Sequence, residues 1–403
     1  MPIFIIFEDQ ILSAQIMNNL SQFYLLFKES PEFLIPLVFF GILFLNHYMS
    51  SKVLVVTKAK KLMTQVNHRS SHETPVPPFG GVSFFLIFML LFAGLIGMGL
   101  DSSAGFLIIG ISFIFISGIK DDLLASSAMM KLLTQFFGAA LIIFLPELQF
   151  QSLHGALGIG SMPEWGFVIF KFYCVLFIIN SFNLIDGIDG LAASVGIIVT
   201  TALIPVFWLG GDPLLAVVCS GIVAMLISFM RFNFSSRKFK LFMGDGGSLT
   251  LGYVLSFLIL RAAAIGSTLP FTESWIPNNI GLYILVIFFL PILDTFRAIV
   301  IRLREGRKVY VADRNHIHHV LIDSGMSHKR ATFVLASTNI LFIAIFVMAD
   351  FYLNTFGMNV LLLSFFAISA ISLRVIHNRN TSEVSKSRSW ARELAMVMRS
   401  LLP

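Results

Sequence analysis

The sequence predicts an all-α, polytopic integral membrane protein with about 10–11 transmembrane helices. Of its 403 residues, 57% are apolar and only 12% are Asp, Glu, Lys or Arg, whereas about 25% of residues are charged in ordinary soluble domains. The mean hydropathy is +0.86. This composition excludes a soluble globular enzyme and a disordered chain. The net charge of +6 is attributed to membrane-flanking loops, so we expect no nucleic-acid partner.

Eleven apolar stretches are candidate membrane spans, because about 20 apolar residues cross the hydrocarbon core. In chain order they are 33–50, 81–100, 104–119, 129–146, 165–182, 188–209, 213–231, 248–265, 279–301, 332–350 and 355–375. The third is short, and the ninth continues into a basic segment. We expect three regions: an N-terminal segment 1–32 without the pattern of a signal peptide, a transmembrane domain 33–375, and a basic tail 376–403.

The distribution of Lys and Arg predicts the orientation of these spans. Basic residues occupy one set of alternate loops: Lys52, Lys58, Lys60, Lys61 and Arg69; Lys120 and Lys131; Arg237, Lys238 and Lys240; and Arg302 through Arg330. The opposite loops contain neither Lys nor Arg: 101–103, 147–164, 210–212, 266–278 and 351–354. By the positive-inside rule, the basic loops and the tail face the cytoplasm and the N-terminus lies outside.

Polar motifs gather in five places, all on the predicted cytoplasmic side. They are NHRSSHETPVPPFGG (67–81), GIKDDLLASSAMMKLLTQ (118–135), NSFNLIDGIDGLAAS (180–194), FMGDGGS (242–248) and DRNHIHH (313–319). The orientation was derived from Lys and Arg alone, and unrelated polar loops would divide between the two faces. Their common side therefore predicts one active site, which cytoplasmic loops form together.

The residue types in these motifs indicate a pyrophosphate site with a divalent cation. Hard oxygen ligands suited to Mg²⁺ or Mn²⁺ are Asp121, Asp122, Asp186, Asp189, Asp245, Asn180 and Asn183. Donors suited to phosphate oxygens are Arg69, His72, Lys131, Arg314, His316, His318 and His319. Glycines in DGIDG and GDGGS permit close backbone approach at helix starts. This combination predicts phosphoryl or phosphoglycosyl transfer with a lipid substrate.

Each motif alone has a simpler interpretation, and these alternatives stay open. The pair Asp121–Asp122 is also typical of a solvated helix cap, and DGIDG of a tight turn between spans. HIHH also suggests zinc, but His316 and His318 do not share a helix face, and hard oxygen ligands predominate. Phosphate contact is therefore the favoured interpretation for the histidines.

Three ionisable residues inside predicted spans need partners. Lys171 lies in the middle of a span, where snorkelling or an intramembrane partner is favoured over catalysis. Asp294 and Arg297 are three residues apart on a helix, so we expect them to form an ion pair.

Two other function classes are compatible with a polytopic chain. An ion-coupled transporter would carry acids near mid-span and paired interrupted helices, whereas the acids here gather at one face. A non-catalytic membrane scaffold or lipid-binding subunit would not require five polar loops. Both are disfavoured relative to an enzyme.

The five motifs, in this order, resemble those of the polyprenyl-phosphate N-acetylhexosamine-1-phosphate transferases (glycosyltransferase family 4) from about Arg69 to about Gly325. DRNHIHH is similar to the WecA-like branch, the undecaprenyl-phosphate GlcNAc-1-phosphate transferases. The peptidoglycan translocase branch usually has three consecutive histidines there. Between Asn233 and Phe242, NFSSRKFKLF is about two residues longer than the family's usual spacing and lacks its prolines.

The resemblance implies a reaction and its partners. A sugar 1-phosphate, most simply GlcNAc-1-phosphate, would pass from a UDP-sugar to undecaprenyl phosphate, with release of UMP and a requirement for Mg²⁺. Another UDP-N-acetylhexosamine or UDP-MurNAc-pentapeptide is the alternative donor. The reaction would be the first membrane step of cell-surface polysaccharide biosynthesis, in the bacterial inner membrane among membrane lipids. Monomer and homodimer both stay open.

Carried over by motif, the resemblance also implies roles. Asn183 and Asp245 would contact the metal. Asp121 and Asp122 would position or deprotonate the lipid phosphate, and Lys131 and His72 would donate to phosphate. Asp189 and Phe242 would hold the uracil, and the histidines of HIHH would face the pyrophosphate or the sugar. With the composition argument, the catalytic set is Asp121, Asp122, Lys131, Asp245, His318 and His319, and the substrate-binding set is Arg69, His72, Asn180, Asp186, Asp189, Phe242, Arg314 and His316.

We expect direct displacement as the mechanism, with the lipid phosphate attacking the β-phosphorus of the donor. The second pKa of a phosphate monoester is near 6, so the nucleophile is already largely dianionic and Asp121 needs only to orient it. The competing mechanism uses an aspartate as the nucleophile and passes through a covalent intermediate.

Overall fold

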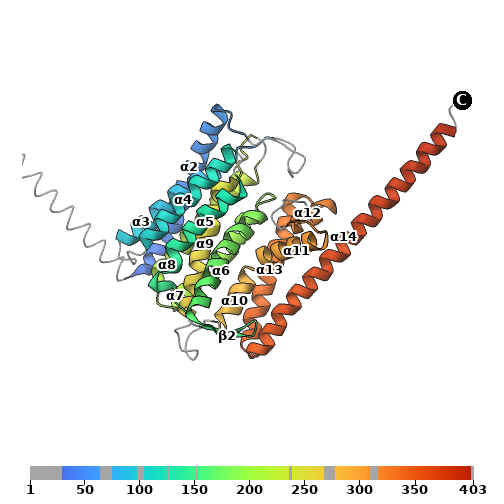
Figure 1. Ribbon diagram of the computed structural model, residues 1–403. Coiled ribbons are helices and arrows are strands. Elements are labelled where there is room, and N and C mark those ends of the chain that lie inside the picture. The colour runs from blue at the N-terminus through green and yellow to red at the C-terminus, as the bar shows by residue number, and fades with distance from the viewer. Residues whose placement is uncertain are drawn as a thin grey trace, which may run out of the picture.

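The computed structural model describes residues 30–63, 75–97, 104–124, 127–150, 152–235, 238–266, 277–308 and 316–400, with side chains up to 379. Each of the eleven predicted stretches is helical over most of its described residues, which confirms the all-α class (Figure 1). The helices are α2 (Leu34–Ala59), α3 (Gly80–Gly97), α4 (Ala104–Leu123), α5 (Ala128–Ile143), α6 (Glu164–Ile185), α7 (Leu191–Leu209), α8 (Pro213–Asn233), α9 (Gly244–Gly266), α10 (Ile280–Ile287), α11 (Phe289–Arg304), α12 (Ile317–Asp323), α13 (His328–Asp350) and α14 (Thr355–Ser400). Short 3₁₀ turns cover Pro31–Phe33 and Pro146–Leu148.

Among the described residues, seven helices are individually long and apolar enough to cross a membrane, or up to eight with the pair α10 and α11. The protein is therefore a multi-pass membrane protein. Many large apolar side chains on these helices are exposed, such as Phe40 and Phe44 on α2, and a lipid-facing surface accounts for them. α9 lies at the centre, in contact with α3, α4, α6 and α7 (Figure 1).

The ninth predicted span is not one straight helix. α10 and α11 meet at Phe288 and are bent by 73°. Pro291 has no N–H to bond the carbonyl of Ile287 four residues earlier, and its ring crowds that carbonyl. The side-chain amide of Asn339 on α13 donates to the Ile287 oxygen at 3.1 Å instead, so the break is satisfied by a partner from another helix.

A β-hairpin between α5 and α6 lies in a loop for which we predicted no strand. β1 (Ser152–Ala156) pairs antiparallel with β2 (Ile159–Ser161). Leu157 and Gly158, the two turn residues, both have positive φ angles, as in a type I′ turn. Asn359 on α14 fixes the turn: its Oδ1 accepts from the Leu157 N–H at 2.7 Å, and its Nδ2 donates to the Gly155 carbonyl at 3.1 Å.

Lys171 on α6 has partners within the protein, which was one of the two explanations that the sequence favoured over catalysis. Its side chain is 1% exposed, and Nζ donates to the carbonyl of Ile143, the last residue of α5, and to Gln149 Oε1, both at 2.9 Å. A cation at a helix C-terminus is stabilised by the carbonyls exposed there. Lys171 is thus a structural residue at the end of α5.

Candidate active site

The ends of four helices converge at the end of the bundle where the basic loops lie. They are the C-terminal end of α4, the first turn of α5, the end of α6 with the loop after it, and the N-terminus of α9. These ends carry the second, third and fourth predicted motifs. Of the five motifs for which the sequence predicts one site, these three lie in contact with one another.

The segment PVPPFGG (75–81) holds the loop that leads into α9. The N–H groups of Gly80 and Gly81 donate to the carbonyls of Phe242 and Met243, each at 2.9 Å, and the Phe242 N–H donates to the Pro77 carbonyl at 2.9 Å. A side chain on Gly81 would collide with the backbone of the first turn of α9. This close approach of two backbones explains the glycine pair, and it fixes the start of α9.

Asp122 caps the N-terminus of α9. Its two carboxylate oxygens accept the backbone N–H groups of Asp245 and Gly246, each at 2.9 Å. Gly244, just before them, has a φ of 73°, which favours glycine. Acceptors at this position satisfy N–H groups that lack helical partners and complement the helix dipole. Burial, and next the charge of Asp245, raise the pKa of Asp122 to about 7.

Lys131 joins two of the carboxylates. Its Nζ lies 2.5 Å from Asp121 Oδ2 and also forms an ion pair with Asp245 Oδ2. Lys131 is in the first turn of α5, which begins after Ser127, whose side chain accepts the Met130 N–H. One ammonium group therefore holds the end of α4 and the start of α9 together.

Asn183 lies beside Asp245. Its Nδ2 donates to Asp245 Oδ1 at 3.1 Å and to Ser248 Oγ at 2.8 Å. Within the described ranges, no three His, Cys, Asp or Glu side chains are grouped so as to hold a metal ion between them. This donor set does not fit a closed zinc site. It does fit Mg²⁺, which is commonly bound by one or two carboxylates and completed by substrate phosphates and water.

Asp186 follows the last residue of α6 as its C-cap. Burial raises its pKa well above the ordinary value, and the charges of Asp245, Asp122 and Asp189 raise it further. Mutual repulsion among carboxylates of this kind would be offset by a cation bound between them.

Asn180 is engaged by the protein. Its Nδ2 donates to Gln135 Oε1 at 2.6 Å, and Gln135 Nε2 donates to Asn180 Oδ1 at 3.2 Å. Gln135 is the last residue of the motif KLLTQ on α5. The amide pair joins α5 to α6. The side-chain amide of Asn180 is therefore bonded to Gln135 and not to the carboxylates.

Asp189 is surrounded by residues that the sequence analysis did not place in the site. Lys240 Nζ lies 2.6 Å from Asp189 Oδ2, and His328 Nδ1 lies 3.6 Å from the same oxygen. Thr332 Oγ1 donates to the Asp189 carbonyl at 2.7 Å. Lys240 also lies 5.6 Å from the centre of the Phe242 ring. The sequence signal for Lys240 was its place two residues before Phe242, but we used it only for orientation.

The three described histidines of the fifth motif lie at the start of α12 and are buried. The ring of His318 lies directly against Gly187, where an added Cβ would collide with Nε2, so the histidine segment contacts the loop that carries Asp186 and Asp189. Burial lowers the pKa of His318 to about 3. The ring centres of His318 and His319 are 4.3 Å apart.

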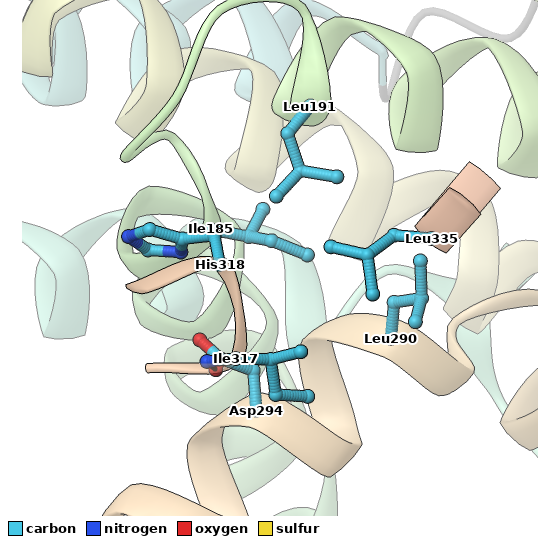
Figure 2. A pocket seen from close by; sticks show the side chains of 7 residues that line it. All are labelled: Ile185, Leu191, Leu290, Asp294, Ile317, His318 and Leu335. Atoms are coloured by element: carbon cyan, nitrogen blue, oxygen red, sulfur yellow. Dashed lines mark hydrogen bonds between the residues drawn. The ribbon is translucent and has the colours of Figure 1, made fainter. Parts of the chain in front are cut away.

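Asp294 contacts the histidine segment, where we had expected it to pair with Arg297. Its Oδ2 accepts from His316 Nδ1 at 2.7 Å, and its Oδ1 accepts the Ile317 N–H at 2.6 Å. Figure 2 shows Asp294 below Ile317 and His318, with Leu191, Leu290 and Leu335 beside them. Three further predicted site residues, Arg69, His72 and Arg314, lie outside the residues that the structure describes.

Comparison with known proteins agrees with this arrangement. The glycosyl transferase family 4 model matches residues 104–263, which include the carboxylates of α4, α6 and α9. A protein of Bacillus subtilis (strain 168), named probable undecaprenyl-phosphate N-acetylglucosaminyl 1-phosphate transferase, is 31% identical over 67% of this chain and 72% of its own length. The chain belongs to glycosyl transferase family 4.

Two further relatives match a similar share of the chain. The undecaprenyl-phosphate alpha-N-acetylglucosaminyl 1-phosphate transferase of Escherichia coli (strain K12) is 27% identical over 73% of this chain and 78% of its own length. The decaprenyl-phosphate N-acetylglucosaminephosphotransferase of Mycobacterium leprae (strain TN) is 27% identical over 72% of this chain and 77% of its own length. The histidine segment lies beyond residues 104–263, so its place in the site depends on the contacts with Gly187 and Asp294.

Proposed function

We propose that this family 4 protein transfers a sugar 1-phosphate from a UDP-sugar to a polyprenyl phosphate, and that the pair is UDP-GlcNAc and undecaprenyl phosphate, with release of UMP. The observation that carries the proposal is the cluster of Asp121, Lys131, Asn183 and Asp245, which closes one end of a membrane-spanning bundle. The three relatives all bear the names of N-acetylglucosaminyl-phosphate transferases that act on polyprenyl phosphates, which supports this choice of sugar.

An apolar cavity supports a lipid acceptor. It has a volume of about 240 Å³ and lies between α6, α9, α10, α11 and the β-hairpin, and its lining extends from Leu157 in the hairpin turn to Phe177 on α6 and Phe296 on α11. Phe177 precedes Asn183 by six residues on α6, which corresponds to about 9 Å along a helix. A prenyl chain in this cavity would carry its phosphate towards the carboxylate cluster.

We also propose that the site binds Mg²⁺, or Mn²⁺ in its place, through Asp245 and Asn183. The proximity of the two side chains and the carboxylate-rich surroundings support this donor set. When bound together with the donor pyrophosphate, the ion would neutralise charge that develops on the phosphate oxygens. The basic end of the bundle would face the cytoplasm by the positive-inside rule, in the inner membrane of a bacterium.

The chain's own residues would act by positioning and by electrostatics. Asp121 would orient the lipid phosphate through Lys131, which donates to phosphate oxygens once substrates are bound. Asp122 would act indirectly, because both of its oxygens hold the backbone at the start of α9. Asp189 and Phe242 would contact the uracil. The attacking oxygen of the lipid phosphate would form the new bond to the β-phosphorus as the bond to the UMP oxygen breaks.

UMP release by the purified protein in detergent tests the proposal. The reaction contains undecaprenyl phosphate, Mg²⁺ and, in turn, UDP-GlcNAc, other UDP-N-acetylhexosamines and UDP-MurNAc-pentapeptide. We expect release with UDP-GlcNAc that depends on both lipid and metal and is lost in Asp245→Asn. Folded protein that binds Mg²⁺ but releases no UMP from any donor would reject the proposal. Release without lipid acceptor, with a sugar phosphate trapped on Asp121 or Asp245, would instead support the covalent mechanism.

A further inference from the structure

A buried carboxylate on α11 is connected to the histidine segment at two consecutive residues. We propose that Asp294 is a positioning residue of the transfer reaction, which anchors the histidine segment through His316 and thereby places His318 against the loop of Asp186 and Asp189. This inference rests on the proposed function. It assigns a role to Asp294 and changes the one expected for His316 from substrate contact to anchor.

The contacts of Asp294 use both of its oxygens. The side chain is 1% exposed, and it accepts from His316 Nδ1 at 2.7 Å and from the Ile317 N–H at 2.6 Å. A buried carboxylate is tolerated only when its oxygens have such partners. The same group therefore fixes an imidazole ring and the backbone at the first residue of α12.

A second residue fixes the orientation of the His316 ring. Arg302 Nη2 lies 3.4 Å from His316 Nε2, and both side chains are buried, at 5% exposed. A guanidinium group can only donate and a carboxylate can only accept, so His316 carries its proton on Nδ1 and accepts at Nε2. Both ring nitrogens thus face protein groups, which leaves neither for the substrate.

The anchor determines where the next histidine lies. The rings of His316 and His318 are nearly parallel, with 5.7 Å between their centres and 8° between their planes. On its other side His318 contacts Gly187. α12 spans only seven residues, which is too short for a helix to hold its own position. Asp294, in the second turn of α11, supplies a fixed point directly beneath it (Figure 2).

Asp294→Asn isolates the contact with His316. Asparagine keeps one oxygen for the Ile317 N–H, but its amide NH₂ replaces the acceptor that faces His316 Nδ1. We expect kcat for UMP release to fall by about 10- to 100-fold, as for other losses of an orienting partner, with the KM for UDP-GlcNAc within about threefold of wild type. Thr295→Val is the matched control, because it changes the adjacent buried polar residue on the same helix and should leave kcat unchanged.

Two substitutions of His316 separate an anchor from a substrate contact. His316→Asn keeps a donor near the position of Nδ1 and should retain most of the activity, whereas His316→Leu should match Asp294→Asn. The double variant with Asp294→Asn and His316→Leu should be no slower than either single variant, because the two residues act as one unit. Equal losses in His316→Asn and His316→Leu would overturn the proposal, and this comparison holds even if Asp294→Asn does not fold.

Hydrogen–deuterium exchange tests the anchor without reference to catalysis. Peptides that cover residues 317–323 should exchange faster in Asp294→Asn than in Thr295→Val, while peptides from α9 should be unchanged. Unchanged exchange in 317–323, or wild-type kcat in folded Asp294→Asn, would overturn the inference. Wild-type protein that releases no UMP would reject the proposed function alone, and the exchange experiment would still decide whether Asp294 anchors the segment.

Discussion

The carboxylate of Asp122 accepts the backbone N–H of Asp245, 123 residues further along the chain, at 2.9 Å. The second of the two adjacent acids at the end of α4 therefore acts on the helix that carries the proposed metal ligand. Its neighbour Asp121 is bound to Lys131 instead. Two residues that look equivalent in the sequence thus have different structural roles.

We expect Asp122→Asn to lower both stability and activity. Asparagine keeps one acceptor oxygen, but its NH₂ group faces the other backbone N–H at the start of α9, which costs about 1–2 kcal/mol of unfolding free energy. Because Asp245 then loses its fixed position, kcat for UMP release should fall by at least about tenfold. Thermal unfolding and UMP release measure the two effects.

Asp212→Asn is the control for this prediction. Asp212 pairs with Arg261 at 2.8 Å, at the end of α9 opposite the site. Its loss should lower the melting temperature but leave kcat per folded molecule unchanged. An Asp122→Asn protein that is less stable but fully active would show that Asp122 is a helix cap and nothing more.

The raised pKa of Asp122 predicts a pH-dependent stability in metal-free protein. The pKa is about 7 in the folded state against the ordinary 3.8, so ionisation costs the folded state more than the unfolded one. Stability from this group is fully present below about pH 4 and is lost as the pH rises towards 7. The melting temperature in EDTA should therefore fall between pH 5 and 7.5.

Mg²⁺ should oppose this loss if it binds among the carboxylates. We expect it to raise the melting temperature more at pH 7.5 than at pH 5, and to do so less in Asp245→Asn. An equal shift at both pH values, or an equal shift in the variant, would contradict binding of the ion at this cluster.

Lys131→Met should reduce kcat by about 10²- to 10³-fold, the cost of removing one donor to a developing charge. Lys131 joins Asp121 to Asp245, so its loss also leaves two carboxylates close together without their shared cation. Lys120→Met is the matched control, because Lys120 is an exposed lysine in the last turn of α4, next to Asp121. If both variants kept wild-type kcat, Lys131 would have only a structural role.

Gly187→Ala should impair activity with little change in stability. The added Cβ collides with the ring of His318, so the histidine must move away from the loop of Asp186 and Asp189. We expect at least a tenfold loss of kcat. In Gly41→Ala the new Cβ meets no atom within 4 Å, so this helical substitution should leave kcat unchanged and stabilise the protein by up to about 1 kcal/mol. Full activity of Gly187→Ala would separate His318 from the reaction.

Lys240→Met should raise the KM for the UDP-sugar by about tenfold, with a smaller change in kcat. Lys240 holds Asp189 at 2.6 Å, and a charge-assisted contact of this kind fixes the carboxylate that we propose for the uracil. Lys240→Arg should restore most of the affinity. Lys238→Met removes the same charge from the same loop and should behave as wild type. A similar KM increase in both methionine variants would indicate a general effect of loop charge.

Much of the architecture follows from the sequence, because spans are set by apolar length and the basic loops by charge. The convergence of Asp121, Asn183 and Asp245 followed from their common face. The bend at Phe288 could not be predicted in the same way, although Pro291 is visible in the sequence. The carbonyl that the bend leaves without a helical partner is bonded by Asn339 of another helix.

Long-range partners of single side chains were the least predictable part of the site. Helical spacing suggested Arg297 for Asp294, yet the observed contact is with His316, 22 residues away. Spacing along one helix is local information, whereas this contact depends on how α11 and α12 meet. Asp189 and Lys240 were likewise brought together by a loop whose length departs from the family pattern.

The contact of Asn359 with the hairpin has a consequence for how the protein is made. Asn359 follows Gly155 by 204 positions, so during synthesis the hairpin emerges long before its fastening residue. The residues of the carboxylate cluster, by contrast, have all been translated by the time α9 emerges. A chain truncated after α13 would thus contain its catalytic groups, but the hairpin between α5 and α6 would lack its hydrogen bonds to Asn359. The contact that fastens the hairpin can therefore form only after the residues of the carboxylate cluster have been synthesised.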